Sequence, residues 1–232
     1  MSAATTNADR GPGTQARTYA GTEKTLREGS AEKRTAILGA ARDLFVSQGV
    51  DRTSMDAIAA RAGVSKRTVY DYFGDKRSLF VAILAAVSQS LSVTAHRALA
   101  EHLPPDERIE TVSRLEEALT ALAVDLGAAI VGSAEYAAGF ALVAQERLRT
   151  PLTEDDIATA AIEEVLAERV ALFADAGLLE VDNPRVAVTH FVALTVLLAY
   201  ERQPVPAHAD PDRTRQIMVD GVHAFIRAYA RR

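Results

Sequence analysis

The spacing of the apolar residues is the feature that most constrains the fold, because they recur every three or four positions over most of the chain. The first such stripe consists of Ile37, Ala40, Ala41, Leu44 and Phe45. Comparable segments occupy residues 76–100, 106–131, 133–149, 154–176, 184–201 and 211–230. This period places apolar side chains on one face of an α-helix, and alternating strand patterns and fixed repeats are absent from the sequence. The sequence therefore predicts an all-α fold of about nine helices.

The residue types present exclude several classes of chemistry. The chain of 232 residues has no cysteine, so disulfides, thiolate nucleophiles and Cys-based metal centres are excluded. The sequence contains no GxSxG, Walker, HExxH or GxGxxG motif, and its five histidines are scattered without an i, i+4 pair. The carboxylates of Glu163, Glu164 and Glu168 are interpreted as a polar helix face. We therefore expect a protein that is not an enzyme and that needs neither a cofactor nor a metal.

Two apolar segments bear on where the protein resides. The first 35 residues contain no apolar run typical of a signal peptide. The most apolar stretch, Val186–Tyr200, spans 15 residues and includes His190, whereas a membrane helix needs about 20 residues. These observations predict a cytoplasmic protein that does not bind membranes.

The charge is distributed unevenly along the chain. Residues 1–80 carry 13 Lys and Arg against 9 Asp and Glu, whereas residues 81–232 carry 13 against 22. A basic N-terminal part joined to an acidic remainder suggests that only the N-terminal part contacts a polyanion, although chance clustering on solvated surfaces gives the same pattern.

Composition also divides the chain into three parts. Residues 1–29 are rich in Ala, Thr and Gly and have almost no large aliphatic side chain besides Leu26, which predicts a disordered arm. Residues 30–80 contain short helical segments, the first expected to begin near Ser30. Residues 81–232 contain long apolar helices and form the larger predicted domain.

Residues 53–73 meet the requirements of two short helices packed nearly at right angles. Ile58, Val64 and Val69 are placed to fill the angle between them, Ala59 is small where the helices approach, and Gly63 tolerates the positive φ of the turn. This pattern is typical of a helix-turn-helix, whose second helix enters the DNA major groove. An ordinary helical hairpin is the alternative.

The wider segment 53–80, TSMDAIAARAGVSKRTVYDYFGDKRSLF, closely resembles the DNA-binding signature of the TetR (tetracycline repressor) family of bacterial transcription regulators. The stripe ending at Phe45, followed by Gly49, matches the helix that precedes this signature in the family. Over residues 81–232 the resemblance is limited to size, helix count and the apolar character of the last two long helices, so it does not identify a ligand.

The resemblance and the helix-turn-helix pattern together imply ten DNA-binding residues: Thr53, Ser54, Ser65, Lys66, Arg67, Thr68, Tyr70, Asp71, Tyr72 and Lys76. Several have alternative roles. Arg67 would contact either guanine or phosphate, and Asp71 either cytosine or Arg67 itself. Tyr72 would contact the DNA backbone or join the core beside Phe73. Thr53 and Ser54 would bind phosphate or simply cap a helix.

The larger domain is predicted to bind a second subunit and a small molecule. Because Val186–Tyr200 is apolar almost all round, we expect burial on two sides, with an interface formed by Phe191, Leu194, Leu198, Ile217, Gly221, Val222 and Phe225. Burial of both helices inside a monomer is the alternative. Polar residues at mostly apolar positions give four candidate ligand contacts: Tyr136, Gln145, Thr189 and His190.

The sequence thus predicts an N-terminal three-helix helix-turn-helix domain joined to a larger helical ligand-binding and dimerisation domain. The expected partners are a double-stranded DNA operator, a small-molecule effector and a second copy of the chain. The expected function is that of a ligand-responsive repressor, released from a palindromic operator by the effector. The alternative is a helical small-molecule-binding or scaffold protein with a non-functional helix-turn-helix.

Overall fold

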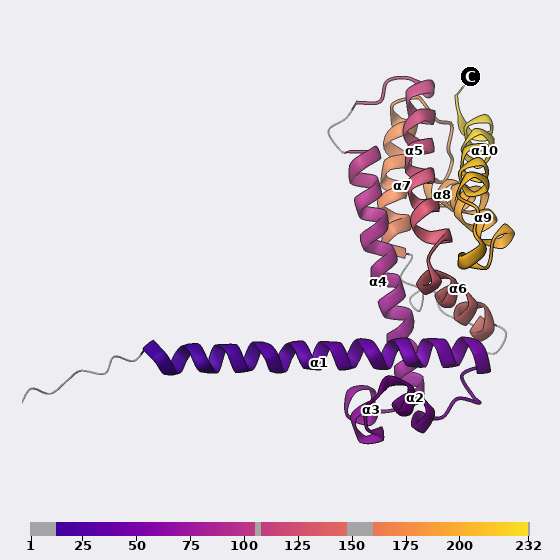
Figure 1. Ribbon diagram of the computed structural model, residues 1–232. Helices are drawn as coiled ribbons and strands as arrows, with labels where there is room; N and C mark the ends of the chain where they lie inside the picture. Colours follow the sequence, from indigo (N-terminus) through magenta and orange to yellow (C-terminus); the bar gives the residue numbers. More distant parts are fainter. Residues whose placement is uncertain (1–12, 105–107, 148–159, 232) are drawn as a thin grey trace, which may run out of the picture. The chain divides into compact units, whose positions relative to one another are not determined.

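The computed structural model describes residues 13–104, 108–147 and 160–231 (Figure 1). Its residues group into two compact units, the first ending at Leu79 and the second beginning at Phe80. In the described residues every regular element is helical, and the only β-type pairing is an isolated bridge between Leu179 and Ala230. The predicted all-α fold is confirmed.

The first unit contains α1 (Gly13–Gln48), α2 (Met55–Ala62), α3 (Lys66–Phe73) and the first residues of α4 (Lys76–His102). Helix α1 packs against α2, and α2 packs against α3. The apolar stripe of α1 is buried, as are Ile58 and Val69, whereas Val64 is only half-buried. The N-terminal unit therefore has its own small core, built from the residues that the helical period singles out.

Helix α1 begins at Gly13, whereas the sequence predicts a start near Ser30. Residues 13–29, expected to be disordered, are thus helical, while residues 1–12 lie outside the described residues. The physical reason is that adding a residue to an existing helix costs little once its first turn has formed. Pro12 is the last proline before α1, so nothing downstream of it breaks the backbone hydrogen-bond ladder.

The second unit continues α4 and adds α5 (Val112–Val131), α6 (Ala134–Arg147), α7 (Ala160–Asp175), α8 (Pro184–Val192), α9 (Leu198–Arg202) and α10 (Pro211–Tyr229). Helix α5 begins later than the predicted Asp106, because Thr111 caps it by accepting a hydrogen bond from the backbone N–H of Arg114. A short 3-10 helix, Pro206–His208, precedes α10.

Helices α5 and α10 pack together at the centre of the second unit. Leu115, Leu122, Met218 and Val222 are fully buried between elements of this unit. An aromatic group joins α8 to α10: the rings of Phe191 and Phe225 meet edge to face with centroids 5.4 Å apart. The core of the larger unit is therefore built mainly from its central and last helices.

Helices α8 and α9 are joined by a π-helical turn, Ala193–Leu197, that the sequence did not reveal. The turn packs against α10 at Gly221. A Cβ placed on Gly221 would lie 2.8 Å from the carbonyl carbon of Leu194, closer still to its oxygen, and 2.9 Å from Cγ2 of Thr195. Gly221 therefore allows two helices of the same chain to approach closely.

This packing corrects part of the predicted subunit interface. Phe191, Gly221, Val222 and Phe225 are buried within one chain, because the aromatic group and the π-helical turn occupy that side of α10. Leu194, Leu198 and Ile217 are only half-buried. The alternative of burial inside the chain thus holds for the first four residues.

Helix α4 is the one helix in the described ranges with the length and apolar composition to cross a membrane. Its side chains Leu79, Phe80, Ile83 and Leu84 are buried near its start, and further along Ala95, Ala98 and Leu99 belong to the core of the second unit. Of the most apolar 18-residue window of α4, 28% is buried.

Candidate nucleic-acid interface and ligand cavity

The turn between α2 and α3 has the predicted helix-turn-helix geometry. Ser54 caps α2 by accepting a hydrogen bond from the N–H of Ala57, and Ser65 caps α3 by accepting one from the N–H of Thr68. Gly63 lies between them in the left-handed conformation, with φ +67°. Each helix is therefore capped at its N-terminus by a serine, and Gly63 caps the C-terminus of α2. These caps fix the geometry of the turn.

Helix α3 presents a polar face to solvent. Val69 and Phe73 are buried on one side, whereas Lys66, Arg67, Tyr70 and Asp71 are exposed on the other. The Arg67 side chain is 90% exposed. Four of the predicted DNA-binding residues thus share one accessible face, as a recognition helix requires.

Two carboxylates lie beside the cations of this face. Lys66 Nζ is 3.0 Å from Asp56 Oδ2, and this hydrogen bond and charge raise the pKa of the Lys66 ammonium. Arg67 Nε lies 3.8 Å from Asp71 Oδ2, which agrees with the alternative that Asp71 pairs with Arg67. Both cations are exposed, so these ion pairs are weak enough for DNA phosphates to compete with them.

Three other predicted DNA-binding residues, Thr53, Tyr72 and Lys76, form hydrogen bonds within the first unit. Thr53 is 2% exposed, and its hydroxyl faces the carbonyl oxygens of Gly49 at 2.9 Å and Leu44 at 3.3 Å. This burial does not fit the predicted phosphate contact, because the hydroxyl proton is already donated to the end of α1. The exposed Ser54, and not Thr53, is the residue that caps α2.

Tyr72 and Lys76 also bind other parts of the first unit. The Tyr72 hydroxyl lies 2.7 Å from the Ser30 hydroxyl and 3.1 Å from the Ser30 carbonyl oxygen, and its ring is beside Phe73. Lys76 Nζ donates to the carbonyl oxygens of Asp51 at 2.9 Å and Thr53 at 3.0 Å. Both side chains therefore brace the helix-turn-helix, although an ammonium has a third proton to donate.

The N-terminus of α4 is capped by the Asp75 side chain. Asp75 accepts a hydrogen bond of 2.7 Å from the backbone N–H of Ser78, and this bond lowers the pKa of the Asp75 carboxyl.

Two hydroxyl groups lie together at the start of α3: that of Thr68 is 2.8 Å from that of Ser65. Ser65 and Thr68 are thus in mutual contact at the start of α3, next to the exposed face.

The second unit contains a cavity of about 280 Å³ lined mainly by apolar side chains. Its walls come from α4, α5, α6, α7, α8 and the π-helical turn, with Leu91, Phe140, Leu166 and Val196 among the lining residues. Of the sixteen lining residues in the described part of the chain, Ser88, Tyr136 and Glu163 are the polar ones. A largely apolar, concave site with a few polar groups is typical of a small-molecule site.

Only one of the four predicted ligand residues lines this cavity. Tyr136 is 6% exposed, and its hydroxyl lies 2.9 Å from that of Thr94 and 3.1 Å from that of Ser90. Gln145 is exposed to solvent and is not part of the lining.

Thr189 and His190 are likewise exposed and outside the cavity lining. The Thr189 hydroxyl donates to the Arg185 carbonyl oxygen at 3.0 Å, and His190 Nδ1 is 2.6 Å from the Tyr229 hydroxyl. Thr189, His190 and Gln145 thus lie outside the lining of this cavity, and their role as ligand contacts stays a prediction.

Glu163 lines the cavity but is not among the ligand-binding residues predicted from the sequence, which indicated a polar helix face for it. The structure puts its side chain among the cavity lining. The signal was present in the spacing, because Glu163 lies three and seven residues before the buried Leu166 and Val170. A carboxylate on the apolar stripe of α7 is the pattern that could have identified it.

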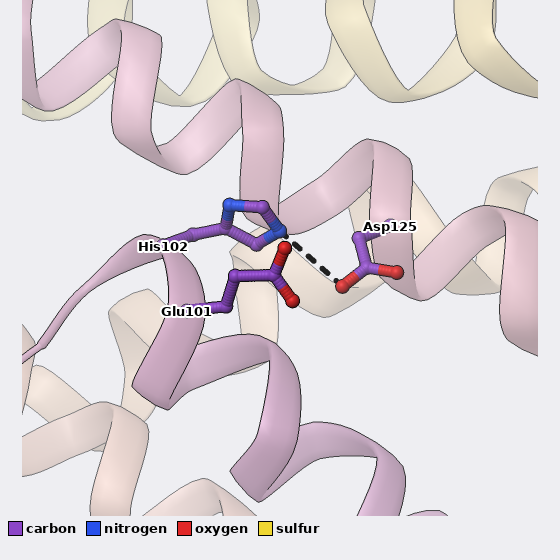
Figure 2. A group of neighbouring side chains, drawn as sticks. All are labelled: Glu101, His102 and Asp125. Carbon is purple, nitrogen blue, oxygen red and sulfur yellow. Dashed lines mark hydrogen bonds and ion pairs between the residues drawn. The ribbon is translucent and has the colours of Figure 1, made fainter.

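Glu101, His102 and Asp125 form the one group of potential metal ligands in the described part of the chain, with ligand atoms within 4.8 Å of one another (Figure 2). Arg97 already supplies a positive charge to both carboxylates, at 3.0 Å from Glu101 and 2.9 Å from Asp125. His102 Nε2 lies 3.3 Å from Asp125. We interpret the group as an ion-pair network that joins α4 to α5.

This network predicts a pH-dependent stability. The hydrogen bond from Arg97 lowers the pKa of the Asp125 carboxyl, so its contribution is complete above about pH 4 and is lost as the pH falls through the lowered value. We expect Asp125→Asn to lower Tm by about 2 °C to 4 °C at pH 7. Thermal melts of both proteins should converge as the pH falls through the lowered pKa of Asp125; a constant difference at all pH values would contradict the interpretation.

Comparisons with known proteins agree with this geometry. Residues 37–83 match the model of the bacterial regulatory proteins of the tetR family. The transcriptional activator FasR of Mycolicibacterium smegmatis is 45% identical over 53 residues, which are 23% of this chain and 24% of FasR. Curated relatives such as FasR and TtgW of Pseudomonas putida are matched over 24% and 46% of their own length.

Two solved structures are similar over most of their length. The flavonoid-responsive regulator FrrA is 28% identical with a TM-score of 0.59, covering 87% of this chain and 99% of FrrA. NalD of Pseudomonas aeruginosa, described as the secondary repressor of the MexAB-OprM multidrug efflux pump, is 26% identical with a TM-score of 0.59, covering 87% and 98%. The likeness thus includes the second unit as well as the helix-turn-helix.

Proposed function

Since this chain belongs to the TetR family of bacterial regulators, we propose that it is a homodimeric, ligand-responsive transcriptional regulator that acts as a repressor. The observation that carries the proposal is the outward face of α3, where Lys66, Arg67 and Tyr70 are exposed together beside a helix-turn-helix turn. Because its target is chromosomal DNA, the protein would act in the cytoplasm.

Each part of the α3 face has a chemical role in this proposal. Arg67 would bind guanine or phosphate through its guanidinium, and Lys66 and Tyr70 would contact the sugar-phosphate backbone. Ser54 and Thr68 each offer a hydroxyl near the start of a helix, where backbone N–H groups favour a phosphate. Asp71 would penalise binding wherever it met a phosphate instead of a cytosine amino group, which favours selective sites.

One helix-turn-helix makes few base contacts, so specific binding requires a second copy related by a two-fold axis. Leu194, Leu198 and Ile217 are half-buried, in the π-helical turn, α9 and α10 respectively. Val186 of α8 and Leu197 of the π-helical turn are 47% and 44% exposed. We place the subunit interface on this side of α8, α9 and α10. It would cover large apolar side chains that a monomer leaves in water.

A charge on this surface should separate the subunits. Ala224 is exposed on α10, one turn from the close approach at Gly221. We expect Ala224→Glu to be monomeric at micromolar concentration in sedimentation and to lose at least 10-fold in operator affinity, because a buried unpaired carboxylate is costly. Ala100→Glu, on an exposed position of α4, is the matched control and should remain dimeric. A dimeric Ala224→Glu protein would exclude this surface.

Response to a ligand would pass through α4. This helix begins in the first unit at Lys76, and its residues Leu84, Val87 and Leu91 line the cavity of the second unit. A ligand releases DNA only if it binds the conformation that is wrong for the operator more tightly. A preference of a few kcal/mol is sufficient for a large change in occupancy.

Binding to the DNA upstream of the protein's own gene tests the function. We expect a footprint over an approximate palindrome with half-site centres about one helical turn apart, and an affinity that falls steeply with salt. Equal affinity for that DNA and for a random duplex would instead support a helical ligand-binding or scaffold protein with a non-functional helix-turn-helix.

A further inference from the structure

We propose that the cavity of the second unit binds a small organic cation, whose positive charge is neutralised by Glu163. The proposal rests on the proposed function only in treating this cavity as the effector site. It names the chemical class of the effector, which neither the family nor its similar structures determine for this chain. Three observations support it: the charges of the lining, the lack of a described partner for Glu163, and the ring of Phe140.

The lining of the cavity carries one kind of charge. Among the lining residues that the structure describes, Glu163 is the only acidic or basic side chain, and none is Lys, Arg or His. A ligand carboxylate or phosphate would lose its hydration without gaining a cation, and it would face the Glu163 carboxylate. A ligand ammonium would gain a counter-charge in apolar surroundings, where an ion pair is strong if its geometry is good.

Glu163 is available for such a ligand. Within the described residues its carboxylate forms neither a hydrogen bond nor an ion pair. The neighbouring Glu164 differs, because it is paired with Arg185 and does not line the cavity. Two adjacent glutamates of α7 therefore have different surroundings, and the one that faces the cavity lacks a described cation.

Of the other two polar lining residues, Ser88 and Tyr136, the larger one already has partners within the chain. The Tyr136 hydroxyl interacts with those of Ser90 and Thr94, so it has little capacity left for a ligand carbonyl or hydroxyl. Phe140 lines the cavity and packs on Tyr200 with ring centroids 4.8 Å apart, which fixes its orientation. Its ring face can attract a cation in the same space.

The size of the cavity limits the ligand to a small one. Its volume of about 280 Å³ lies just below the range of about 300–1,000 Å³ that is usual for ligand sites. Helices α4 and α6 approach closely at Gly139, where a Cβ would lie 2.7 Å from Cγ1 of Val87. One or two fused rings with a short amine side chain match this space better than a long acyl chain.

Three probes with one ring system test the charge preference: 1-naphthylmethylamine, 1-naphthalenemethanol and 1-naphthoate. Their affinities for the full-length protein are measured by calorimetry at pH 7, with and without operator DNA. We expect the amine to bind at least about 10-fold more tightly than the alcohol, and the carboxylate to bind least, because burial makes the charge interaction strong. Glu163→Gln should remove the preference for the amine and leave the affinity for the alcohol unchanged.

Glu164→Gln is the matched control, because it removes the same charge from the next residue outside the cavity and should retain the preference. Thermal melts confirm that both variants are folded. The proposal is overturned if the amine does not bind in preference to the other two probes, or if Glu163→Gln leaves its preference intact. Failure of the proposed function would appear separately, as loss of specific operator binding by the unliganded protein.

Discussion

The double variant Lys66→Ala/Arg67→Ala should lose at least about 100-fold in operator affinity, because a dimer loses four cationic contacts with DNA. Both side chains lie on the solvent-exposed face of α3 and neither is needed for the core of the first unit. The stability of the protein should therefore be almost unchanged. Electrophoretic mobility shifts over a range of salt concentrations would measure the effect, and the dependence of log K on log salt should weaken by about 1 for each phosphate contact removed.

A control with the same change in net charge distinguishes the α3 face from general attraction to DNA. Arg108→Ala/Arg114→Ala removes two positive charges from exposed positions of the second unit. We expect its operator affinity to stay within about 3-fold of the unaltered protein, since screening weakens contributions from distant surface charges. Equal losses in the two double variants would show that α3 is not the recognition helix.

The largest effect on stability is expected for Gly221→Ala. The new methyl group would meet the backbone of Leu194, which belongs to the π-helical turn and cannot rotate away as a side chain can. Overpacking against backbone should cost roughly 3 kcal/mol. Thermal unfolding should then show Tm lowered by about 6 °C to 12 °C.

Two other glycines provide matched controls for this substitution. Gly39 lies inside α1, and an added methyl group there would have nothing within 4 Å, so Gly39→Ala should raise stability by up to about 1 kcal/mol. The three atoms nearest to a Cβ on Gly127 all belong to the side chain of Met218, the closest being Cε at 2.5 Å, and this unbranched side chain is flexible. Gly127→Ala should therefore cost less than Gly221→Ala, and the reverse order would contradict the backbone contact.

The helix-turn-helix could be predicted in detail because its requirements are local. Gly63 is needed for one positive φ, Ser65 for one cap, and Val69 and Phe73 for one buried stripe, all within a few residues of one another. The cap of α2 shows the limit of this reasoning. Thr53 and Ser54 are both suitable caps, and only the fold of the end of α1 around Thr53 decides that Ser54 is the cap.

The site of the second unit is less predictable, because the position of a polar residue in the sequence does not specify which neighbouring helix it faces. Thr189 and His190 interrupt an apolar run and were expected to face a ligand, yet both are exposed. Glu163 lies among other acidic residues and was expected to face solvent, yet it lines the cavity. Which side of a helix faces a cavity depends on the helices packed around it, which one amphipathic pattern does not specify.

By itself the sequence determined the helical class, the order of the helices and the residues of the second helix of the helix-turn-helix, because helical period, caps and turns depend on neighbours three or four residues apart. The tertiary structure alone decided that Gly221 serves a contact inside one chain, that Tyr72 and Lys76 brace the first unit, and that Glu163 faces an apolar cavity. Those outcomes depend on contacts between residues far apart in the chain, and the free energy of such contacts is set by packing geometry that no local pattern records.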